Sequence, residues 1–391
     1  MKIVIAPDSF KESLSASEVA NAIEAGFVGV FPNAEVLKLP VADGGEGTTE
    51  ALISATQGRY FSTQVMGPMG EFINASWAML GNSKTAVIEV AKACGLSLVP
   101  LENRNPMSAT SHGVGELILA AVNKGANHII VGLGGSACND GGAGLLQALG
   151  LRLLDISGNQ LNRGGGSLHS LSSIDPGAID SRLQGVSFEV ACDVDNPLLG
   201  PQGASVIFAR QKGADSEMID QLDANLTRYS DILTSTIKKD VSEVPGSGAA
   251  GGIGSAFLAF LNAELKSGIN IVLDVMNFEH HIKGADLVIT GEGRFDSQSI
   301  RGKAPIGVAK CAKRNRCLVF VIAGSVEDDE RLIHKHDIDR VFSVVSKQLT
   351  LEQALVNPSE SITLASISAA KYFRDHHYAL SLQDRTIQLV A

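Results

Sequence analysis

Apolar runs and helical patterns alternate at the beginning of the chain. Residues 3–6 (IVIA) predict a short buried strand, and apolar residues recur at helical spacing over 19–27. Ser15 and Glu18 form a capping box, which predicts where this helix begins. The same order of strand, polar loop and helix follows at 35–55. Each polar loop therefore follows a strand and precedes a helix, the position at which parallel sheets bind ligands.

The middle of the chain has a different pattern. The sequence GPMG at 67–70 predicts a turn between two alternating stretches, 61–66 and 73–80. These stretches indicate hairpins in a mixed sheet. The strand–helix rhythm of the beginning returns at 285–290 (ADLVIT).

This change of pattern predicts an α/β protein with two domains. We expect residues 1–62 and 284–391 to form a discontinuous domain with a parallel sheet, of the flavodoxin-like or Rossmann-like kind. Residues 63–283 would form a second α/β domain with a mixed sheet, inserted into the first.

Composition and charge narrow the class of ligand. The chain has 391 residues, of which 45% are hydrophobic and 19% charged, enough for two buried cores. The formal net charge is -10 and no basic run occurs, which argues against nucleic acid and anionic membranes as partners. A small anionic substrate is compatible with this charge, because a site needs only local positive charge.

The cysteines and the beginning of the chain indicate a cytoplasmic protein. The 5 cysteines are scattered and form no CxxC motif, which favours free thiols in a reducing compartment and argues against zinc. The apolar run at 3–6 is too short for a signal peptide, and no run approaches the ~20 residues of a membrane span.

A glycine-rich loop at 132–144 (GLGGSACNDGGAG) is a candidate phosphate site. Glycines let the backbone approach a ligand, and amides at a helix N-terminus favour phosphate. Ser136 and Asn139 add hydrogen-bond donors, and Asp140 could hold Mg²⁺. The alternative is a tight strand-to-helix turn, with Asn139 or Asp140 as the helix cap. The chain has no GxxxxGK[ST] motif, nor a GxGxxG motif that opens a first strand–helix unit.

Polar side chains follow the predicted strands elsewhere. Asp43 could bind Mg²⁺ or accept a proton, or could simply begin a turn. Asp193 follows another strand and is a candidate base or cap. Arg294 could clamp a carboxylate or a phosphate, or could pair internally with Asp296.

The opening loop belongs with these acids. Asp8, Ser9 and Lys11 would lie at the same sheet edge as Asp43 and residues 292–296. Lys11 supplies positive charge for an anion, and Asp8 or Ser9 can bind its hydroxyl groups. For Ser9 alone, ordinary turn chemistry is the alternative.

Six long motifs identify a family. The chain resembles the class I bacterial glycerate kinases over essentially its full length, and the motifs occur in the family's order and spacing. Two residues depart from the family pattern: Glu12 stands where Gly is expected, and Cys138 where Thr is usual. The matching motifs are APDSFKESLSA, PVADGGEGT, GLGGSACNDGGAG, CDVDNPLLGP, PGSGAAGGIG and TGEGRFDSQSIRGKAP.

The resemblance implies a kinase that uses ATP with Mg²⁺ and phosphorylates D-glycerate in glyoxylate or sugar-acid breakdown. It favours 2-phosphoglycerate as product, with 3-phosphoglycerate as the alternative; a nucleotide-dependent dehydrogenase or a non-catalytic sugar-acid sensor is the rival class. The resemblance leaves open whether the chain forms a homodimer.

Residue roles at the matched positions follow from chemistry. The expected catalytic residues are Asp193, Lys11 and Arg294. The expected substrate-binding residues are Asp8, Ser9, Asp296 and Glu292. The expected ATP-phosphate contacts are Gly134, Gly135, Ser136, Asn139 and Gly141. The expected metal ligands are Asp43 and Asp140.

Overall fold

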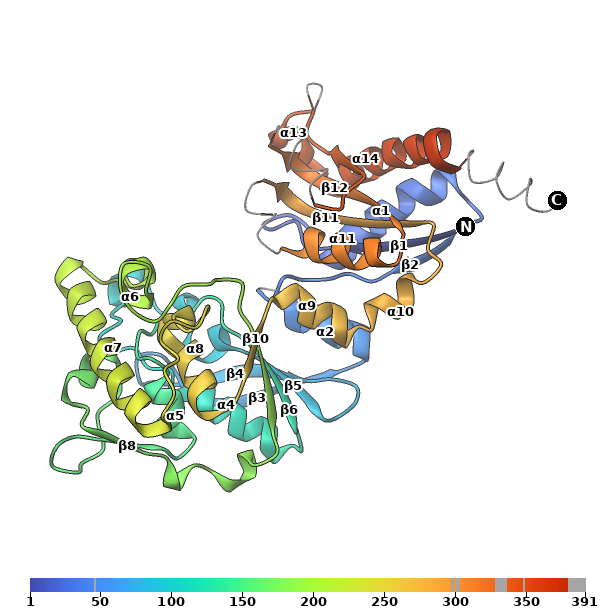
Figure 1. Cartoon of the computed structure of the whole chain (residues 1–391). Helices are drawn as coiled ribbons and strands as arrows, with labels where there is room; N and C mark the ends of the chain where they lie inside the picture. Colours follow the sequence, from blue (N-terminus) through green and yellow to red (C-terminus); the bar gives the residue numbers. More distant parts are fainter. Residues whose placement is uncertain (46, 297–298, 300–302, 328–335, 347–348, 379–391) are drawn as a thin grey trace. The chain divides into compact units, whose positions relative to one another are not determined.

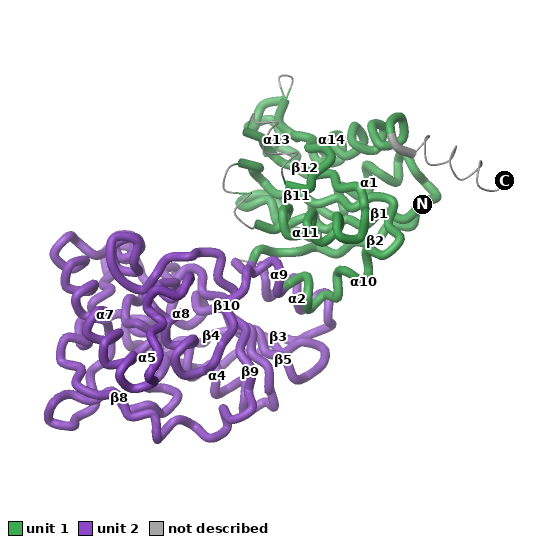
Figure 2. The backbone as a smooth tube through the Cα atoms, viewed as in Figure 1, with its two compact units in different colours: residues 1–43, 272–391 green, residues 44–271 purple. Residues whose placement is uncertain are grey.

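The chain divides into two compact units, shown in Figures 1 and 2. Unit 1 contains residues 1–43 and 272–391, and unit 2 contains residues 44–271. The structure is a computed structural model that describes residues 1–45, 47–296, 299, 303–327, 336–346 and 349–378.

Unit 1 is built on a parallel sheet. Its strands are β1 (Lys2–Pro7), β2 (Glu35–Lys38), β11 (Leu287–Phe295), β12 (Leu318–Val326) and β13 (Arg340–Ser343). They lie in the order β13-β12-β11-β1-β2, and every neighbouring pair is parallel. Counted within the unit, this is the flavodoxin-like order, which confirms the predicted fold class. The order reverses between β1 and β11, so a ligand site is expected at that point.

Helices complete unit 1. They are α1 (Ala16–Val30), α10 (Phe278–Ile282), α11 (Ala304–Arg314), α13 (Leu351–Val356), α14 (Pro358–Phe373) and a π-helical turn, η8 (Arg374–Tyr378). The predicted capping box begins α1: the Glu18 amide donates to Ser15 Oγ, and the Ser15 amide to the Glu18 carboxylate. Helices α1 and α14 pack side by side (Figure 1). Together with the sheet they bury the core residues Ile3, Ile5, Ile23, Phe27, Phe320 and Phe373.

Unit 2 contains a mixed sheet, as predicted. Its strands are β3 (Arg59–Met66), β4 (Phe72–Met79), β5 (Thr85–Glu89), β6 (His128–Gly132), β9 (Ser187–Ala191) and β10 (Glu264–Lys266), in the order β10-β9-β6-β5-β4-β3. The β3–β4 and β4–β5 pairs are antiparallel, and the others are parallel. A separate ribbon pairs β7 (Arg152–Leu154) with β8 (Ser173–Asp175). The carboxyl ends of β5, β6, β9 and β10 therefore share one edge.

Helices surround this sheet within unit 2. The α-helices are α2 (Thr48–Thr56), α3 (Val90–Cys94), α4 (His112–Asn123), α5 (Ala143–Ala148), α6 (Ala204–Phe208), α7 (Ser216–Ile237) and α8 (Ala249–Phe260), and α9 (Gly268–Val275) crosses the boundary between the units. The 3-10 helices are η1 (Leu96–Leu98), η2 (Leu101–Asn103), η3 (Gly165–Ser170), η4 (Pro176–Ala178), η5 (Ser181–Leu183) and η6 (Arg210–Lys212). In the part of the chain that the structure describes, no helix has both the length and the hydropathy needed to span a membrane.

The unit boundaries differ from the predicted domain ranges. The chain passes between units after Asp43 and after Ile271, whereas the sequence analysis placed the boundaries after residues 62 and 283. The first difference has a clear cause: α2 packs on β4 and β5, and β3 pairs with β4, so both elements share the contacts of unit 2.

Candidate functional site

A pocket of about 440 Å³ lies at the carboxyl edge of the sheet in unit 1. It includes the point between β1 and β11 at which the strand order reverses. The opening loop and the end of β11 both line it, as the sequence predicted. Its charged lining residues are Asp8, Lys11, Glu12, Asp43, Glu292, Arg294 and Lys303.

Asp8 is the buried acid that follows β1. Its amide donates to the Gly291 carbonyl at 2.9 Å, and its carboxylate accepts from the Ser9 amide at 2.6 Å. Burial raises the pKa of Asp8 to about 7, and the nearby charge of Asp43 adds to this increase. The Ser9 hydrogen bond and the charge of Lys11 oppose it.

Glu292 is a second buried acid, on the neighbouring strand. Burial raises the pKa of Glu292 to about 7, against the effects of a hydrogen bond with Ser299 and of the Lys303 charge. Lys303 Nζ lies 3.6 Å from Glu292 Oε2. Asp8 and Glu292 can thus each hold or release a proton near neutral pH, as a general acid or base must.

The cations of this pocket differ in their partners. Arg294 Nε lies 3.3 Å from Asp296 Oδ2, and its guanidinium also pairs with Glu327. This is the internal pairing that the sequence analysis gave as the alternative to ligand binding. Lys11 is exposed and forms no ion pair within the described part of the chain, so it is the cation most available to an anion.

In unit 2, the loop that leads into α2 packs against the ends of β9 and α9. Gly44 has φ +93°, and a Cβ there would lie 2.7 Å from Gly268 Cα and 3.2 Å from Ala191 Cβ. The exposed Asp193 follows β9, and its carboxylate accepts from the Gly268 amide at 3.1 Å. Asp193 therefore lies at the carboxyl edge of this sheet, where the sequence analysis placed a candidate base.

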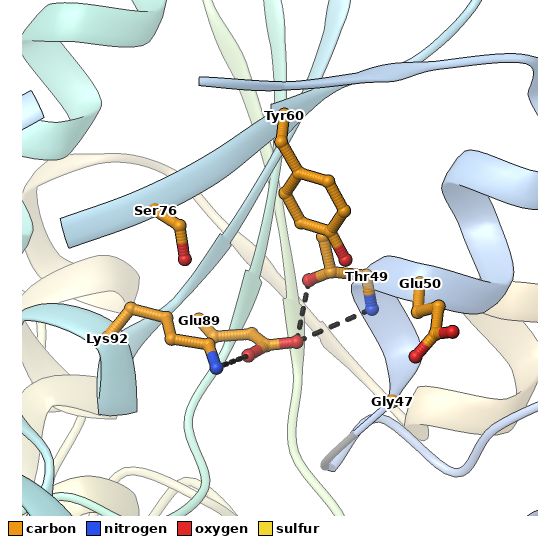
Figure 3. Close-up of a pocket in the computed structure, with 7 residues that line it drawn as sticks. All are labelled: Gly47, Thr49, Glu50, Tyr60, Ser76, Glu89 and Lys92. Carbon is orange, nitrogen blue, oxygen red and sulfur yellow. Dashed lines mark hydrogen bonds and ion pairs between the residues drawn. The ribbon is translucent and has the colours of Figure 1, made fainter. Parts of the chain in front are cut away.

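A second pocket, of about 330 Å³, lies beside this loop (Figure 3). Thr49 Oγ1 donates to Glu89 Oε1 at 2.6 Å, and Lys92 Nζ lies 3.8 Å from Glu89 Oε2. Tyr60 and Ser76 complete the polar wall. This pocket was not predicted from the sequence, although Glu89 has the same feature as the predicted site residues: it is an acid at the end of an apolar strand.

The first half of the glycine-rich loop is open. Gly134 and Gly135 follow β6 and are exposed, and a Cβ at Gly134 would meet nothing within 4 Å. Ser136 and Asn139 are buried, and their side chains already form hydrogen bonds within the protein. Lys212 Nζ donates to Ser136 Oγ at 3.1 Å, and Asn139 Nδ2 donates to Ser205 Oγ at 2.9 Å. Only the two glycines present backbone that a phosphate could reach.

The second half of the loop is packed into the core. A Cβ at Gly141 would lie 2.8 Å from the Tyr229 ring. Asp140 is fully buried, and its Oδ2 accepts from the Ser111 amide at 2.9 Å and from the Gly144 amide at 3.2 Å. Its Oδ1 accepts from the Gly142 amide at 3.1 Å. These contacts favour the structural alternative for Asp140 over the expected role as a metal ligand.

Lys212 was also missed by the sequence analysis. It is a buried lysine whose Nζ donates to the Cys138 carbonyl at 2.6 Å as well as to Ser136. Burial lowers the pKa of Lys212, and the nearby Cys138, Cys94 and Asp140 oppose this effect. The ammonium therefore holds the glycine-rich loop from beneath. No local pattern in RQKG marks it as buried.

The chain matches the model of the glycerate kinase family over residues 3–374. It belongs to the glycerate kinase family. It is 56% identical over 370 residues to the glycerate 2-kinase of Escherichia coli (strain K12), which covers 95% of this chain and 97% of that protein. It is 54% identical over 360 residues to the glycerate kinase of Bacillus subtilis (strain 168), covering 92% of this chain and 94% of that protein.

A solved structure agrees with these matches. A protein from Salmonella typhimurium LT2, assigned as glycerate kinase 2, superposes with a TM-score of 0.87 at 51% sequence identity, covering 96% of this chain and 98% of that chain. As a member of the glycerate kinase family, the chain is a kinase. Its sites must therefore hold a phosphoryl donor and an acceptor.

The two departures from the family pattern have structural consequences. Glu12 has φ +62°, a left-handed conformation that favours glycine, yet the turn stays closed because the Leu14 amide donates to the Phe10 carbonyl at 3.0 Å. Cys138 is buried, with its Sγ 3.9 Å from the Ala250 carbonyl. Its side chain therefore packs in the core.

Proposed function

We propose that the chain transfers the γ-phosphoryl group of ATP to the C2 hydroxyl of D-glycerate and releases 2-phosphoglycerate and ADP. Membership of the glycerate kinase family supports the kinase, and the Escherichia coli relative named a glycerate 2-kinase supports the position. The observation that carries the proposal is the pair of buried acids, Asp8 and Glu292, beside Lys11 in one pocket.

The pocket of unit 1 supplies groups for the acceptor. Lys11 pairs with the carboxylate of glycerate, and Ser9 donates a hydrogen bond to a hydroxyl group. Asp8 or Glu292 accepts the proton of the reacting hydroxyl, which a carboxylate with a pKa of about 7 can do at neutral pH. The C2 oxygen then forms a bond to the γ-phosphorus as the bond to the β–γ bridging oxygen breaks. ADP leaves with that oxygen.

The same pocket has donors suited to Mg²⁺. Asp43 lines it, and its charge helps to raise the pKa of Asp8, so these carboxylates lie close enough for their charges to interact. Within the described residues no group of three His, Cys, Asp or Glu side chains forms a complete metal site. Mg²⁺ commonly binds one or two carboxylates together with substrate phosphates and water. When bound, Mg²⁺ would neutralise charge on the phosphates.

The remaining predicted residues keep narrower roles. Gly134 and Gly135 stay candidates for phosphate contacts because they are exposed. Asp193 stays a prediction for the base, and Asp296 acts through its pairing with Arg294. Ser136, Asn139, Gly141 and Asp140 support the loop from inside the core. A cytoplasmic location and a homodimer stay predictions.

One assay tests both the reaction and the position. Purified protein is incubated with ATP, Mg²⁺ and D-glycerate in the presence of enolase and without a mutase, and ADP and phosphoenolpyruvate are followed together. We expect equal rates of both, and neither product after EDTA. ADP release without phosphoenolpyruvate would identify the C3 hydroxyl as acceptor. Absence of glycerate-dependent ADP release would contradict the proposed function.

A further inference from the structure

The pocket of unit 1 continues beyond its charged residues onto an apolar wall that the sequence analysis did not include. The wall comes from the end of β13, from α13 and from the first turns of α14. Its residues are Val344, Val345, Leu351, Leu355, Pro358 and Ile362. Charged and apolar residues therefore occupy opposite ends of one pocket.

The strand order sets the distance between these two ends. The charged residues lie at the ends of β1 and β11, and the apolar wall begins after β13, two strand positions from β11 and three from β1. At ~4.8 Å per strand, the wall therefore begins roughly 10–14 Å from these strand ends along the sheet. The pocket volume of about 440 Å³ is typical of sites for molecules larger than a three-carbon acid. Glycerate alone would leave the apolar end empty.

The leucines of the wall are exposed, and the helices that carry them are anchored. Leu351 and Leu355 lie one helical turn apart on α13 and are 54% and 52% exposed, respectively. Thr350 and Gln353 form a capping box that fixes the beginning of this helix. The buried Ser361 donates through its Oγ to the Ala354 carbonyl at 3.3 Å, which ties α14 to α13. Large apolar side chains that are held in place but left open fit a flat apolar ligand.

Glycines keep the floor between the two ends bare. Gly293 and Gly324 lie next to each other on β11 and β12, and both line the pocket. A Cβ at Gly324 would lie 2.4 Å from the Gly293 carbonyl oxygen, so no side chain fits there. A ligand can thus extend from the charged end to the apolar wall without an obstructing side chain at these positions.

We propose that the apolar wall binds the base of a nucleoside triphosphate, with the phosphates directed towards Lys303. The inference rests on the proposed function for its choice of a nucleotide, because a kinase needs a phosphoryl donor. A base is flat and largely apolar on its faces, and the triphosphate is strongly anionic. The two ends of the pocket match these two parts of one molecule.

A double variant, Leu351→Gln with Leu355→Gln, tests the wall. A matched control is Leu364→Gln, because Leu364 is 55% exposed on α14 and does not line the pocket. We measure the Kd for a fluorescent N-methylanthraniloyl ATP, the KM for ATP and the KM for D-glycerate. The double variant should raise the Kd and the KM for ATP roughly tenfold, which corresponds to ~1.4 kcal/mol. The KM for D-glycerate and the control variant should match wild type.

Inorganic tripolyphosphate separates the base from the phosphates. Wild type and the double variant should bind tripolyphosphate equally, since it has no base to contact the wall. If the wild type phosphorylates D-glycerate and the double variant keeps its affinity for ATP, the inference about the wall is wrong. If the double variant loses affinity for the fluorescent ATP but the wild type phosphorylates no hydroxy acid, the proposed function is wrong and the inference stands.

Discussion

Asp8 and Glu292 show how position alone changes the chemistry of ordinary carboxyl groups. Each follows or ends an apolar strand, and each is only 7% exposed. Burial raises the pKa of both to about 7, because an ionised carboxylate loses hydration there. A proton acceptor near neutral pH thus arises from the sheet itself, without a histidine.

Asp8→Asn should lower kcat by about 10²–10⁴-fold, the usual contribution of a positioned acid or base. It should also stabilise the fold more at pH 8 than at pH 5. An unfolded Asp8 ionises near pH 3.8, whereas the folded group stays protonated up to about pH 7. Asp8 therefore lowers the free energy of unfolding increasingly as the pH rises through this window. Asn does not ionise, so the variant lacks this dependence on pH.

Thermal melts in EDTA at both pH values measure this effect, with Asp195→Asn as the control because Asp195 is exposed. The increase in Tm caused by Asp8→Asn should be larger at pH 8, and the control should show no such difference. An equal change in Tm at both pH values would show that the pKa of Asp8 is not raised.

Individual residues could be predicted where a strand end marked them. The positions of Asp8, Lys11, Asp43 and Glu292 at one sheet edge follow from the rule that parallel strands place their carboxyl ends together. Lys212 could not be predicted, because its burial depends on a loop far away in the sequence. The apolar wall was not predicted, because in the sequence Leu351 and Leu355 resemble the core-facing residues of a helix.

At the scale of the element, the glycine-rich loop after β6 serves two purposes. Gly134 and Gly135 are exposed, whereas Gly141 and Gly142 have positive φ angles and pack against α7 and α8. The motif looks uniform in the sequence because both purposes require glycine. Only the structure separates backbone that a ligand could reach from backbone that neighbouring helices cover.

Gly142→Ala and Gly134→Ala should therefore differ. Gly142 has φ +77°, and a Cβ would lie 2.6 Å from Ala256 Cβ, so alanine adds strain of ~1–2 kcal/mol and a steric clash. We expect a Tm lower by several degrees, measured by circular dichroism. Gly134→Ala should keep the wild-type Tm and raise the KM for ATP if this backbone binds phosphate. Equal loss of Tm in both variants would contradict the division of the loop.

The helices and strands themselves were easier to predict than the elements against which each of them packs. The capping box fixed the beginning of α1, and the alternating pattern fixed β3 and β4. The sequence did not reveal that the chain enters unit 2 directly after Asp43. That boundary depends on α2 packing against β4 and β5, which no pattern within 44–62 specifies.

At the scale of the whole molecule, the two units have separate cores, one formed by a continuous segment of the chain and the other by two distant segments. Unit 2 is continuous in sequence, and its core includes Ile88, Val131 and Phe257. Unit 1 combines two distant segments: β1 lies between β2 and β11 and contributes the fully buried Ile3 and Ile5. The two units should therefore respond differently when the chain is cut.

A fragment of residues 44–275, which keeps α9 intact, should fold by itself and melt in one cooperative transition, because its sheet and core are complete. A fragment of residues 276–391 should show no such transition, because β11 lacks its partner β1 and the buried face of the sheet is exposed to water. Adding residues 1–43 as a separate peptide should restore the transition, since it returns β1, α1 and β2. Circular dichroism and calorimetry of the fragments, alone and mixed, measure these outcomes. A cooperative transition in 276–391 alone would show that β1 is dispensable for unit 1, and its absence in 44–275 would show that unit 2 needs the rest of the chain.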